Sequence, residues 1–324
     1  MDYSKNDAKE WARENLKGQW TTMITPFTTD DELDEEGLRR NIEHVVKLGV
    51  AGMGFSWNMG EFWSLTPDER SRLMEIVPEM VKGRARIAFQ VTSTSLKEVI
   101  SMSNKASGLG YDFVIIAPPF IMTKNEEQAI RFVSAAAEKA EIGMAFYNSP
   151  QFGIVMSARG LSRLAEIKNL IAIKEASFNM QLGIDTHLLA GDKAVVSVPD
   201  EEIFFFEEYY GIKQQVMFAN TSDWRFDTQS SNNYVHFIDL ATNGKLKEAK
   251  ELYAKIKPIK MVSRKWWSRL VARTGGALPV QMAKYWGELM GMSGGHVRAP
   301  LLQMEEQEKQ ELKKDLENLG LVRS

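Results

Sequence analysis

Two residues of the sequence combine a reactive side chain with a place at the end of a short apolar run. Lys174 ends the run 170–174, and Tyr147 ends the run 143–147. Burial at such a place disfavours the ammonium form of lysine, and the neutral amine is the nucleophile that forms a Schiff base. A tyrosine hydroxyl beside this amine can carry protons to and from the reacting atoms. The pair therefore predicts covalent imine chemistry.

Each of these residues also has a structural interpretation. Lys174 at the rim of a sheet can pair with the neighbouring Glu175, and Tyr147 can be a core residue whose hydroxyl finds a partner. Either residue alone leaves both interpretations open. Their occurrence at the ends of two successive apolar runs favours catalysis.

A third segment has the composition of an anion-binding turn. The apolar run 52–56 leads into Trp57, Asn58, Met59 and Gly60. A glycine-containing turn at a strand end exposes backbone N–H groups, which can bind a carboxylate without a charged side chain. The alternative is an ordinary loop between a strand and a helix.

The composition excludes several other kinds of chemistry. The chain has 324 residues, no cysteine and four scattered histidines, so thiolate nucleophiles, disulfides and cysteine metal sites are impossible. We expect no metal and no nucleotide cofactor, because neither metal-ligand spacing nor a glycine-rich phosphate loop is present. The net charge of −3 gives no reason to expect a nucleic-acid or membrane partner. With no long apolar segment for a signal peptide or a membrane helix, we expect a cytoplasmic protein.

These candidate residues are positioned by an alternation of apolar runs and helical periodicity. The expected strands are 20–25, 52–56, 86–91, 113–117, 143–147, 170–174, 194–198 and 214–219. The expected helices between them are 36–48, 66–81, 95–109, 125–140 and 157–167. Such an alternation predicts an α/β fold with a parallel sheet, and eight units favour a closed (β/α)8 barrel, the TIM barrel, over an open sheet. Active groups of such a barrel lie at the carboxyl ends of the strands, where the candidates are found.

The organisation along the chain predicts three parts. Residues 1–17 form an N-terminal helical extension, residues 18–230 the barrel, and residues 231–324 a C-terminal helical appendage. The appendage is expected to contain helices only, at 234–243, 245–273, 279–290 and 303–318. It either packs on the barrel or forms a subunit interface.

Six segments together resemble the dihydrodipicolinate synthase / N-acetylneuraminate lyase family of class I aldolases. They are 18–27, 60–69, 118–119, 147–150, 173–177 and 294–301. The most specific part is Tyr-Asn-x-Pro at 147–150 followed by Ile-Lys-Glu at 173–175. The similarity extends over about residues 18–302, which is nearly the whole chain.

The resemblance implies a barrel with C-terminal helices that assembles as a homo-oligomer, either a tetramer or a dimer. Lys174 would form the Schiff base with a 2-oxo acid, typically pyruvate, and Tyr147 would be the acid and base. The backbone of Asn58, Met59 and Gly60 would hold the carboxylate of the 2-oxo acid. The protonated imine stabilises the enamine that is left when the carbon–carbon bond breaks, so no metal is implied.

The chain departs from the family pattern at three places. Asn58 stands where members commonly have a threonine of the proton relay, and Phe120 stands at the place of a relay tyrosine. Gln151 and Phe152 follow Pro150, where the synthases carry an arginine for the carboxylate of the aldehyde. An acidic aldehyde would therefore be poorly paired, which argues against a true dihydrodipicolinate synthase. This segment is more similar to hydratase-aldolases that cleave aryl-substituted unsaturated pyruvates.

Aromatic residues gather in the loops that are expected at the barrel mouth. They are Trp57, Phe62, Trp63, Phe120, Phe152 and Trp224. They predict a hydrophobic pocket for the aldehyde, with Trp57, Phe120 and Phe152 as substrate-binding residues, although packing between strands and helices is the alternative. Nearby Arg225 either replaces the missing arginine or pairs with a neighbouring aspartate, Asp223 or Asp227.

The leading hypothesis is a lyase that makes or breaks the carbon–carbon bond between pyruvate and a relatively apolar, aromatic aldehyde. Two alternatives remain open at this point. One is a dehydratase or lyase of the same family that acts on a 2-keto-3-deoxy sugar acid. The other is a catalytically impaired relative that only binds a keto acid.

Overall fold

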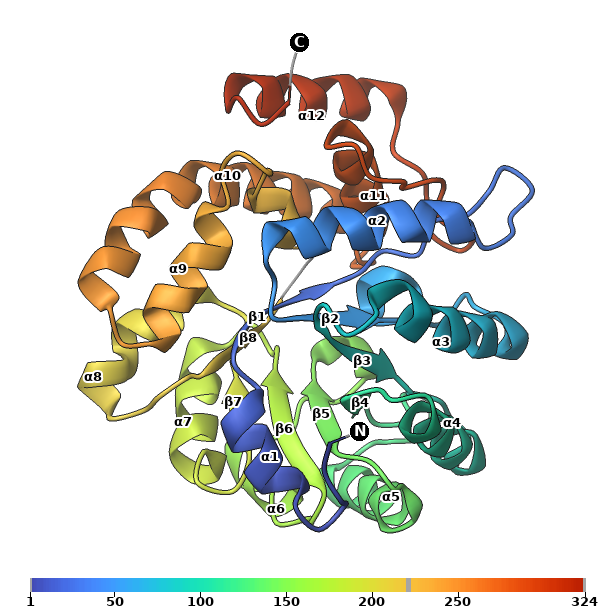
Figure 1. Cartoon of the computed structure of the whole chain (residues 1–324), viewed down its shortest axis with the longest axis vertical. Coiled ribbons are helices and arrows are strands. Elements are labelled where there is room, and N and C mark those ends of the chain that lie inside the picture. Colours follow the sequence, from blue (N-terminus) through green and yellow to red (C-terminus); the bar gives the residue numbers. More distant parts are fainter. Residues whose placement is uncertain (1, 220–222, 323–324) are drawn as a thin grey trace. The chain divides into compact units, whose positions relative to one another are not determined.

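The computed structural model describes residues 2–219 and 223–322. The strands are β1 (Gly18–Thr22), β2 (Gly52–Phe55), β3 (Arg86–Gln90), β4 (Phe113–Ile116), β5 (Met144–Asn148), β6 (Leu170–Glu175), β7 (Val195–Ser197) and β8 (Val216–Phe218) (Figure 1). They form one sheet in the order β7-β6-β5-β4-β3-β2-β1-β8. Because β7 and β8 also contact each other, the sheet is nearly closed. The fold is the expected (β/α)8 barrel with C-terminal helices.

Most of the α-helices follow the strands one by one. They are α1 (Ala8–Asn15), α2 (Glu35–Leu48), α3 (Pro67–Val81), α4 (Leu96–Gly108), α5 (Glu126–Lys139), α6 (Ala158–Leu164), α7 (Met180–Ala190), α8 (Glu207–Tyr210), α9 (Asn233–Thr242), α10 (Leu246–Arg273), α11 (Val280–Leu289) and α12 (Glu306–Asn318). Short 3-10 helices are η1 (Asn58–Gly60), η2 (Pro150–Phe152), η3 (Glu201–Phe206) and η4 (Asp223–Phe226). Each strand expected from the sequence overlaps an observed one.

Side-chain caps explain where several helices begin. Thr66, Ser95, Asn125 and Ser157 precede α3, α4, α5 and α6, and each side chain accepts a hydrogen bond from the third amide of its helix. At α3 the cap is reciprocal, because Glu69 also accepts from the amide of Thr66. The helix expected at 66–81 therefore begins directly after this cap.

The described chain divides into two compact units. The first consists of Met1–Trp20, Arg86–Asn220 and Ala241–Leu246, and the second of Thr21–Ala85, Thr221–Leu240 and Lys247–Ser324. Among the described residues, no helix is long and apolar enough to cross a membrane.

In the first unit, α1 lies against the amino ends of the strands. Lys9 and Arg13 donate hydrogen bonds to the backbone oxygens of Ala165 and Asp192, which precede β6 and β7. Gln215, just before β8, donates to the backbone oxygen of Leu16. The N-terminal helix therefore closes the end of this unit that is opposite to the carboxyl ends of the strands.

An aromatic cluster fills the interior of the first unit. The ring of Trp20 lies 5.0 Å from that of Phe113 and 5.8 Å from that of Phe218, measured between centroids. These residues come from β1, β4 and β8. Since β1 and β4 are not neighbours in the sheet, the rings meet inside the barrel and make it a packed core rather than a channel.

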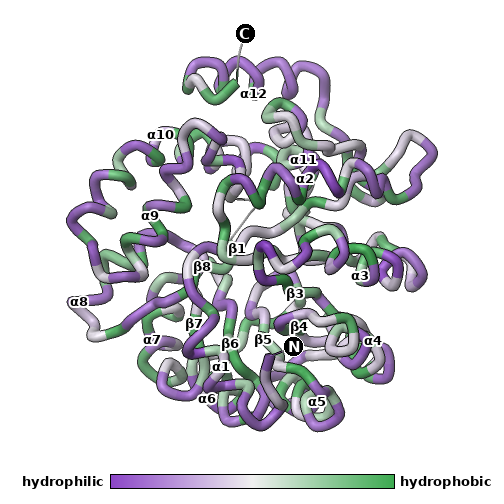
Figure 2. The backbone as a smooth tube through the Cα atoms, in the orientation of Figure 1, coloured by the Kyte–Doolittle hydropathy of each residue, from purple (hydrophilic) through white to green (hydrophobic). Residues whose placement is uncertain are grey.

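In the second unit, the last three helices share a core. It is built from Trp266, Leu270, Met282, Trp286, Met304, Leu312 and Leu316. Helix α12 is hydrophilic along most of its length (Figure 2), and Leu312 and Leu316 are its buried apolar contacts. Arg273 of α10 also pairs with the buried Glu308 of α12, at 3.0 Å.

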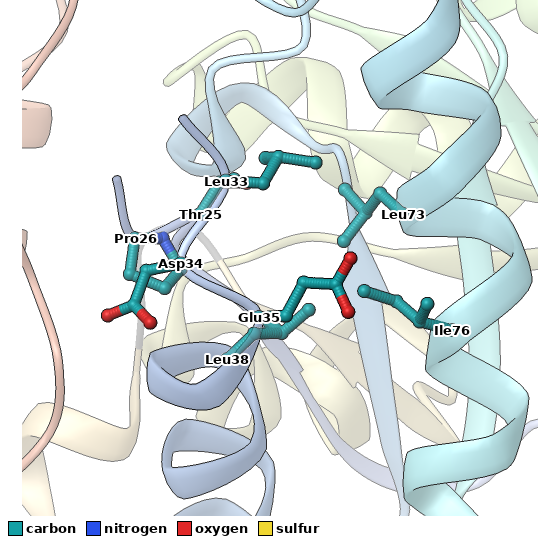
Figure 3. A pocket seen from close by; sticks show the side chains of 8 residues that line it. All are labelled: Thr25, Pro26, Leu33, Asp34, Glu35, Leu38, Leu73 and Ile76. Atoms are coloured by element: carbon teal, nitrogen blue, oxygen red, sulfur yellow. The ribbon is translucent and has the colours of Figure 1, made fainter. Parts of the chain in front are cut away.

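A small hollow in the second unit lies beside the segment that follows β1. Figure 3 shows Leu73 and Ile76 of α3 pointing toward Leu33 and Glu35, with Thr25 and its neighbour Pro26 on the other side. The hollow has no room for a water molecule. It is a packing feature between α2 and α3.

Candidate active site

The two candidate catalytic side chains of the first unit lie in register on adjacent strands. Tyr147 of β5 pairs with Lys174 of β6, and Lys174 pairs in turn with Ser197 of β7. Lys174 is 1% exposed, and its Nζ donates a hydrogen bond of 2.5 Å to the backbone oxygen of Ala219. The same nitrogen lies 4.6 Å from the centroid of the Tyr147 ring. The expected proximity of amine and phenol is thus present.

The carboxylate of Glu175 has partners other than the lysine that precedes it. It accepts hydrogen bonds from the side chain of Asn148, at 3.2 Å, and from the backbone amide of Ser177, at 3.1 Å. Successive side chains of a strand point to opposite faces, so Glu175 faces away from Lys174. Burial raises the pKa of the Glu175 carboxyl. This geometry favours the catalytic interpretation of Lys174 over an ion pair at the rim.

Tyr147 is buried next to an apolar ring. The ring of Phe152 stands edge-on to it, with 5.2 Å between the centroids. Burial raises the pKa of the Tyr147 hydroxyl, so this group stays protonated at neutral pH and can donate a proton or a hydrogen bond. The pair provides an acid beside an apolar surface.

The loop after β5 places Phe152. Asn148 holds both ends of this loop, because its amide group donates to the backbone oxygen of Met156 and accepts from the backbone amide of the same residue. Gly153 turns the chain in a left-handed conformation, and a Cβ there would lie 3.2 Å from the backbone oxygen of Phe120. The backbone at Phe120 therefore packs against the loop after β5. The Phe120 side chain itself is 38% exposed.

In the second unit, the segment after β2 forms the expected tight turn. Gly60 donates its amide to the oxygen of Trp57, and Glu61 donates to that of Asn58. Thr25 donates a buried side-chain hydrogen bond of 2.8 Å to the oxygen of Gly60. Asn58, Met59 and Gly60, which we call the 58–60 turn, thus form η1 and are all buried.

Glu61, directly after the 58–60 turn, takes part in a buried ion pair. Its carboxylate lies 2.6 Å from Nζ of Lys284 on α11, and also accepts from the backbone amide of Arg298. Burial lowers the pKa of Lys284, and Glu61 opposes this shift. The resemblance marked Glu61, but nothing in the local sequence marked Lys284, since only packing brings α11 to this turn.

Two expected pocket residues of the second unit are buried in packing contacts. Trp57 covers Gly54 of β2, where a Cβ would lie 2.3 Å from the indole ring. The Trp224 indole donates to the backbone oxygen of Thr22. The contribution of Trp57 to substrate binding stays a prediction.

Arg225 is oriented toward the C-terminal helices. Its guanidinium lies 5.0 Å from the ring centroid of Trp286 on α11 and donates to the side chain of Ser263 on α10. Asp227, one of its expected partners, accepts from the backbone amides that begin α9. These contacts place Arg225 against α10 and α11, and its suggested contact with the substrate or with an aspartate stays a prediction. Asn220, Thr221 and Ser222 of the same loop lie outside the described residues.

The structure therefore brings the site residues together in two groups. In the first unit Tyr147 contacts both Lys174 and Phe152, and the 58–60 turn forms part of the second unit. Across residues 2–219 and 223–322, no group of three or more His, Asp or Glu side chains could hold a metal ion.

Comparison with known proteins shows to which family a chain with this fold and these site residues belongs. The model of the dihydrodipicolinate synthetase family matches residues 15–319, which is nearly the whole chain. The chain belongs to the dihydrodipicolinate synthetase family. Members of this family are class I aldolases, so the protein is a carbon–carbon lyase.

Curated relatives in the dihydrodipicolinate synthetase family cover the chain almost completely. A 4-hydroxy-tetrahydrodipicolinate synthase of Methanococcus maripaludis (strain C6) is 28% identical over 310 residues, which cover 95% of this chain and 100% of the relative. One from Geotalea uraniireducens is 29% identical over 309 residues, with the same coverage of 95% and 100%. At this identity the family is shared, whereas the aldehyde substrate is open.

Solved structures agree on the fold. A crystal structure of dihydrodipicolinate synthase has a TM-score of 0.79 at 25% identity, covering 94% of this chain and 100% of its own. A prophage protein of the family from E. coli K12, described in complex with pyruvate, has a TM-score of 0.80 at 23% identity, covering 95% and 99%. A monomeric dihydrodipicolinate synthase variant has a TM-score of 0.78 at 20% identity, covering 94% and 97%.

Proposed function

We propose that this enzyme forms a Schiff base between Lys174 and pyruvate, and that its second substrate is an apolar, aromatic aldehyde. The observation that carries the proposal is the buried group of Lys174, Tyr147 and Phe152. It combines an amine, a protonated phenol and an apolar ring within one contact network. An amine and a phenol serve imine formation, and the ring favours an apolar partner.

Imine formation uses both polar groups. The neutral amine of Lys174 attacks C2 of pyruvate, and the carbonyl oxygen gains two protons and leaves as water. One proton comes from the amine, and the other is delivered through the Tyr147 hydroxyl. The protonated imine that remains is an electron sink, because the electron pair of a breaking carbon–carbon bond moves into the enamine.

The same tyrosine serves the step at the aldehyde. An arylidene pyruvate has no hydroxyl, so water first adds to its double bond, which is conjugated with the imine, and supplies one. In cleavage Tyr147 then accepts the proton of this hydroxyl as the aldehyde forms, and in condensation it returns the proton. The raised pKa of Tyr147 makes a lasting phenolate unfavourable, so the proton must pass through the hydroxyl during the step. Asn58, which stands at the place of a relay threonine, is proposed to hydrogen-bond without carrying a proton.

The carboxylate of the 2-oxo acid is proposed to bind to the backbone of the 58–60 turn. The support is the family resemblance together with the tight geometry of this turn. The amides of Gly60 and Glu61 close the turn, and the family resemblance assigns the carboxylate to the backbone of Asn58, Met59 and Gly60.

The apolar aldehyde is inferred from the residues that stand at the place of the family's arginine and relay tyrosine. Phe152 follows Pro150 and Gln151, where a synthase has an arginine, and Phe120 lies on the neighbouring loop. An acidic aldehyde would bring a carboxylate to an apolar ring without a bidentate partner. We therefore propose that the enzyme is not a true dihydrodipicolinate synthase.

Turnover of three substrates tests the proposed aldehyde. We expect kcat/KM for cleavage of an arylidene pyruvate to exceed by at least about a hundredfold the values for condensation with aspartate semialdehyde and for a 2-keto-3-deoxy sugar acid. Preference for aspartate semialdehyde would contradict the proposed specificity. Preference for the sugar acid would favour the alternative of a dehydratase or lyase that acts on a 2-keto-3-deoxy sugar acid.

We also propose a cytoplasmic homo-oligomer that works without a metal or cofactor. Sedimentation at micromolar concentration should give a dimer or tetramer, and dialysis against EDTA should leave the activity unchanged. A monomer at all concentrations, or loss of activity that added metal restores, would contradict these two points.

A further inference from the structure

The ion pair of Glu61 and Lys284 is buried, and the proposed reaction does not use it. Their side chains are 0% and 1% exposed, and the carboxylate and ammonium lie 2.6 Å apart. Removing two charges from water is costly unless the geometry and additional hydrogen bonds compensate. Here Lys284 also donates to the backbone oxygen of His296 and lies 4.2 Å from the ring centroid of Phe27. The pair is thus fully enclosed, and each side chain has one further polar partner, the oxygen of His296 for Lys284 and the amide of Arg298 for Glu61.

Glu61 connects this pair to the 58–60 turn. Its own amide closes the turn by donating to the oxygen of Asn58, at 3.2 Å. Its backbone adopts a left-handed conformation with φ of 54°, and Ser56 before the turn has φ of 55°. Residues with side chains hold this conformation only where the surroundings enforce it. The ion pair and the hydrogen bond from the Arg298 amide provide this enforcement on the Glu61 side chain.

The turn has little freedom on its other side. Thr25 binds the oxygen of Gly60, and a Cβ at Gly60 would lie 3.0 Å from the backbone oxygen of Met23. The backbone of the turn is therefore held between the segment after β1 and the Glu61 side chain. We therefore expect that loss of either contact would let the amides of the turn change direction.

We propose that Glu61 and Lys284 are positioning residues which hold the 58–60 turn in the conformation that binds the carboxylate of the 2-oxo acid. The inference rests on the proposed role of this turn. Neither side chain touches the substrate in this account. The pair sets how tightly pyruvate binds before the chemistry, and it leaves the reactivity of the Lys174 amine unchanged.

Borohydride trapping at varied pyruvate concentration separates these effects. Glu61→Gln keeps the shape of the side chain and removes the charge. We expect the pyruvate concentration for half-maximal trapping at Lys174 to rise about tenfold to a hundredfold, as is typical when a residue that orients a binding group is lost. The extent of trapping at saturating pyruvate should stay that of the wild type.

A second variant addresses folding. Glu61→Gln leaves a buried ammonium without its counter-ion, which destabilises the protein. The double variant Glu61→Gln with Lys284→Met removes both charges and should recover thermal stability. Its half-maximal concentration should nevertheless remain raised, because the turn is no longer held.

Glu308→Gln is the matched control. It breaks the ion pair between the buried Glu308 and the partly exposed Arg273 in the same unit, beside the core of the C-terminal helices. We expect wild-type half-maximal pyruvate in this variant. Equal half-maximal concentrations in Glu61→Gln, the double variant and the wild type would overturn the inference, as would an equal rise in Glu308→Gln. Absence of any adduct in the wild type contradicts the proposed function and the inference with it.

Discussion

Lys174 and Tyr147 show how backbone register determines which side chains meet. Each residue occupies the carboxyl end of its strand, and the pairing of β5 with β6 places them opposite each other. Glu175 points to the other face of β6 and accepts hydrogen bonds from Asn148 and Ser177, so the Lys174 amine points into the barrel. The residue types supply the amine and the phenol, and the strand register places them next to each other.

Tyr147→Phe tests the role of the phenol. Loss of a general acid and base lowers kcat by about 10²- to 10⁴-fold, while the apolar contact with Phe152 persists. Stopped-flow turnover of the substrate preferred by the wild type measures this change. Tyr111→Phe is the control, since it removes another fully buried hydroxyl of the same unit. A kcat within twofold of the wild type in Tyr147→Phe would exclude the tyrosine from proton transfer.

Phe152→Ala tests the origin of the aldehyde preference. Removal of the ring takes away apolar contact, so kcat/KM for an arylidene pyruvate should fall about 10- to 150-fold more than for an aliphatic analogue. Phe152→Leu should retain most of the preference because it keeps the apolar volume. An equal loss of kcat/KM for both substrates would show that Phe152 only positions Tyr147 and does not contact the aldehyde.

Most elements could be predicted because each follows a local pattern. The alternation of apolar runs with amphipathic stretches predicted the strands and most of the helices between them. Helix α7 was not predicted, since its apolar residues surround the helix: Ile184 is buried, whereas Leu188 and Leu189 are exposed. The pair of Glu61 and Lys284 was also missed, because its members are far apart in the sequence and only tertiary packing joins them.

Helix α7 also carries a buried histidine. Nε2 of His187 lies 3.2 Å from the side-chain oxygen of Gln214, which also accepts from the amide of Val198 after β7. Burial lowers the pKa of His187 to about 4, so it is neutral in the folded protein at pH 5. In the unfolded chain the pKa is near 6.5, and the histidine takes up a proton there first. The stability that this difference in pKa contributes is therefore fully present above pH 6.5, and it decreases as the pH falls toward 4.

His187→Asn should remove this pH dependence. Between pH 7 and pH 5 the histidine costs the wild type about 2 kcal/mol of unfolding free energy, at 1.36 kcal/mol for each unit of pKa difference. Urea unfolding of both proteins at the two pH values measures the difference. An equal loss in the variant and the wild type would show that His187 is protonated in the folded state.

On the scale of the whole molecule, the two ends of the strands have different tasks. In the first unit, α1 contacts residues that precede the strands, whereas Tyr147 and Lys174 lie at the opposite ends. Trp11 anchors this helix by stacking on Tyr3, at 4.5 Å between centroids, and by contact with the guanidinium of Arg86, at 5.1 Å. Stability and catalysis are thus separable within the unit.

Trp11→Ala tests this separation. Loss of a large buried ring should lower the unfolding free energy by about 3 kcal/mol. The pyruvate concentration for half-maximal trapping should remain that of the wild type, because the site is at the other end of the strands. Chemical denaturation and trapping on the same preparation measure both quantities. A large rise in this concentration would show that α1 controls the site.

The central claim is that Lys174 forms an imine with pyruvate. Reduction with borohydride in the presence of pyruvate, followed by intact-mass measurement and peptide mapping, tests it most directly. We expect one reduced pyruvate adduct for each chain, located on Lys174 and absent from Lys174→Ala. No adduct in the wild type, or an adduct that persists in Lys174→Ala, would contradict the account.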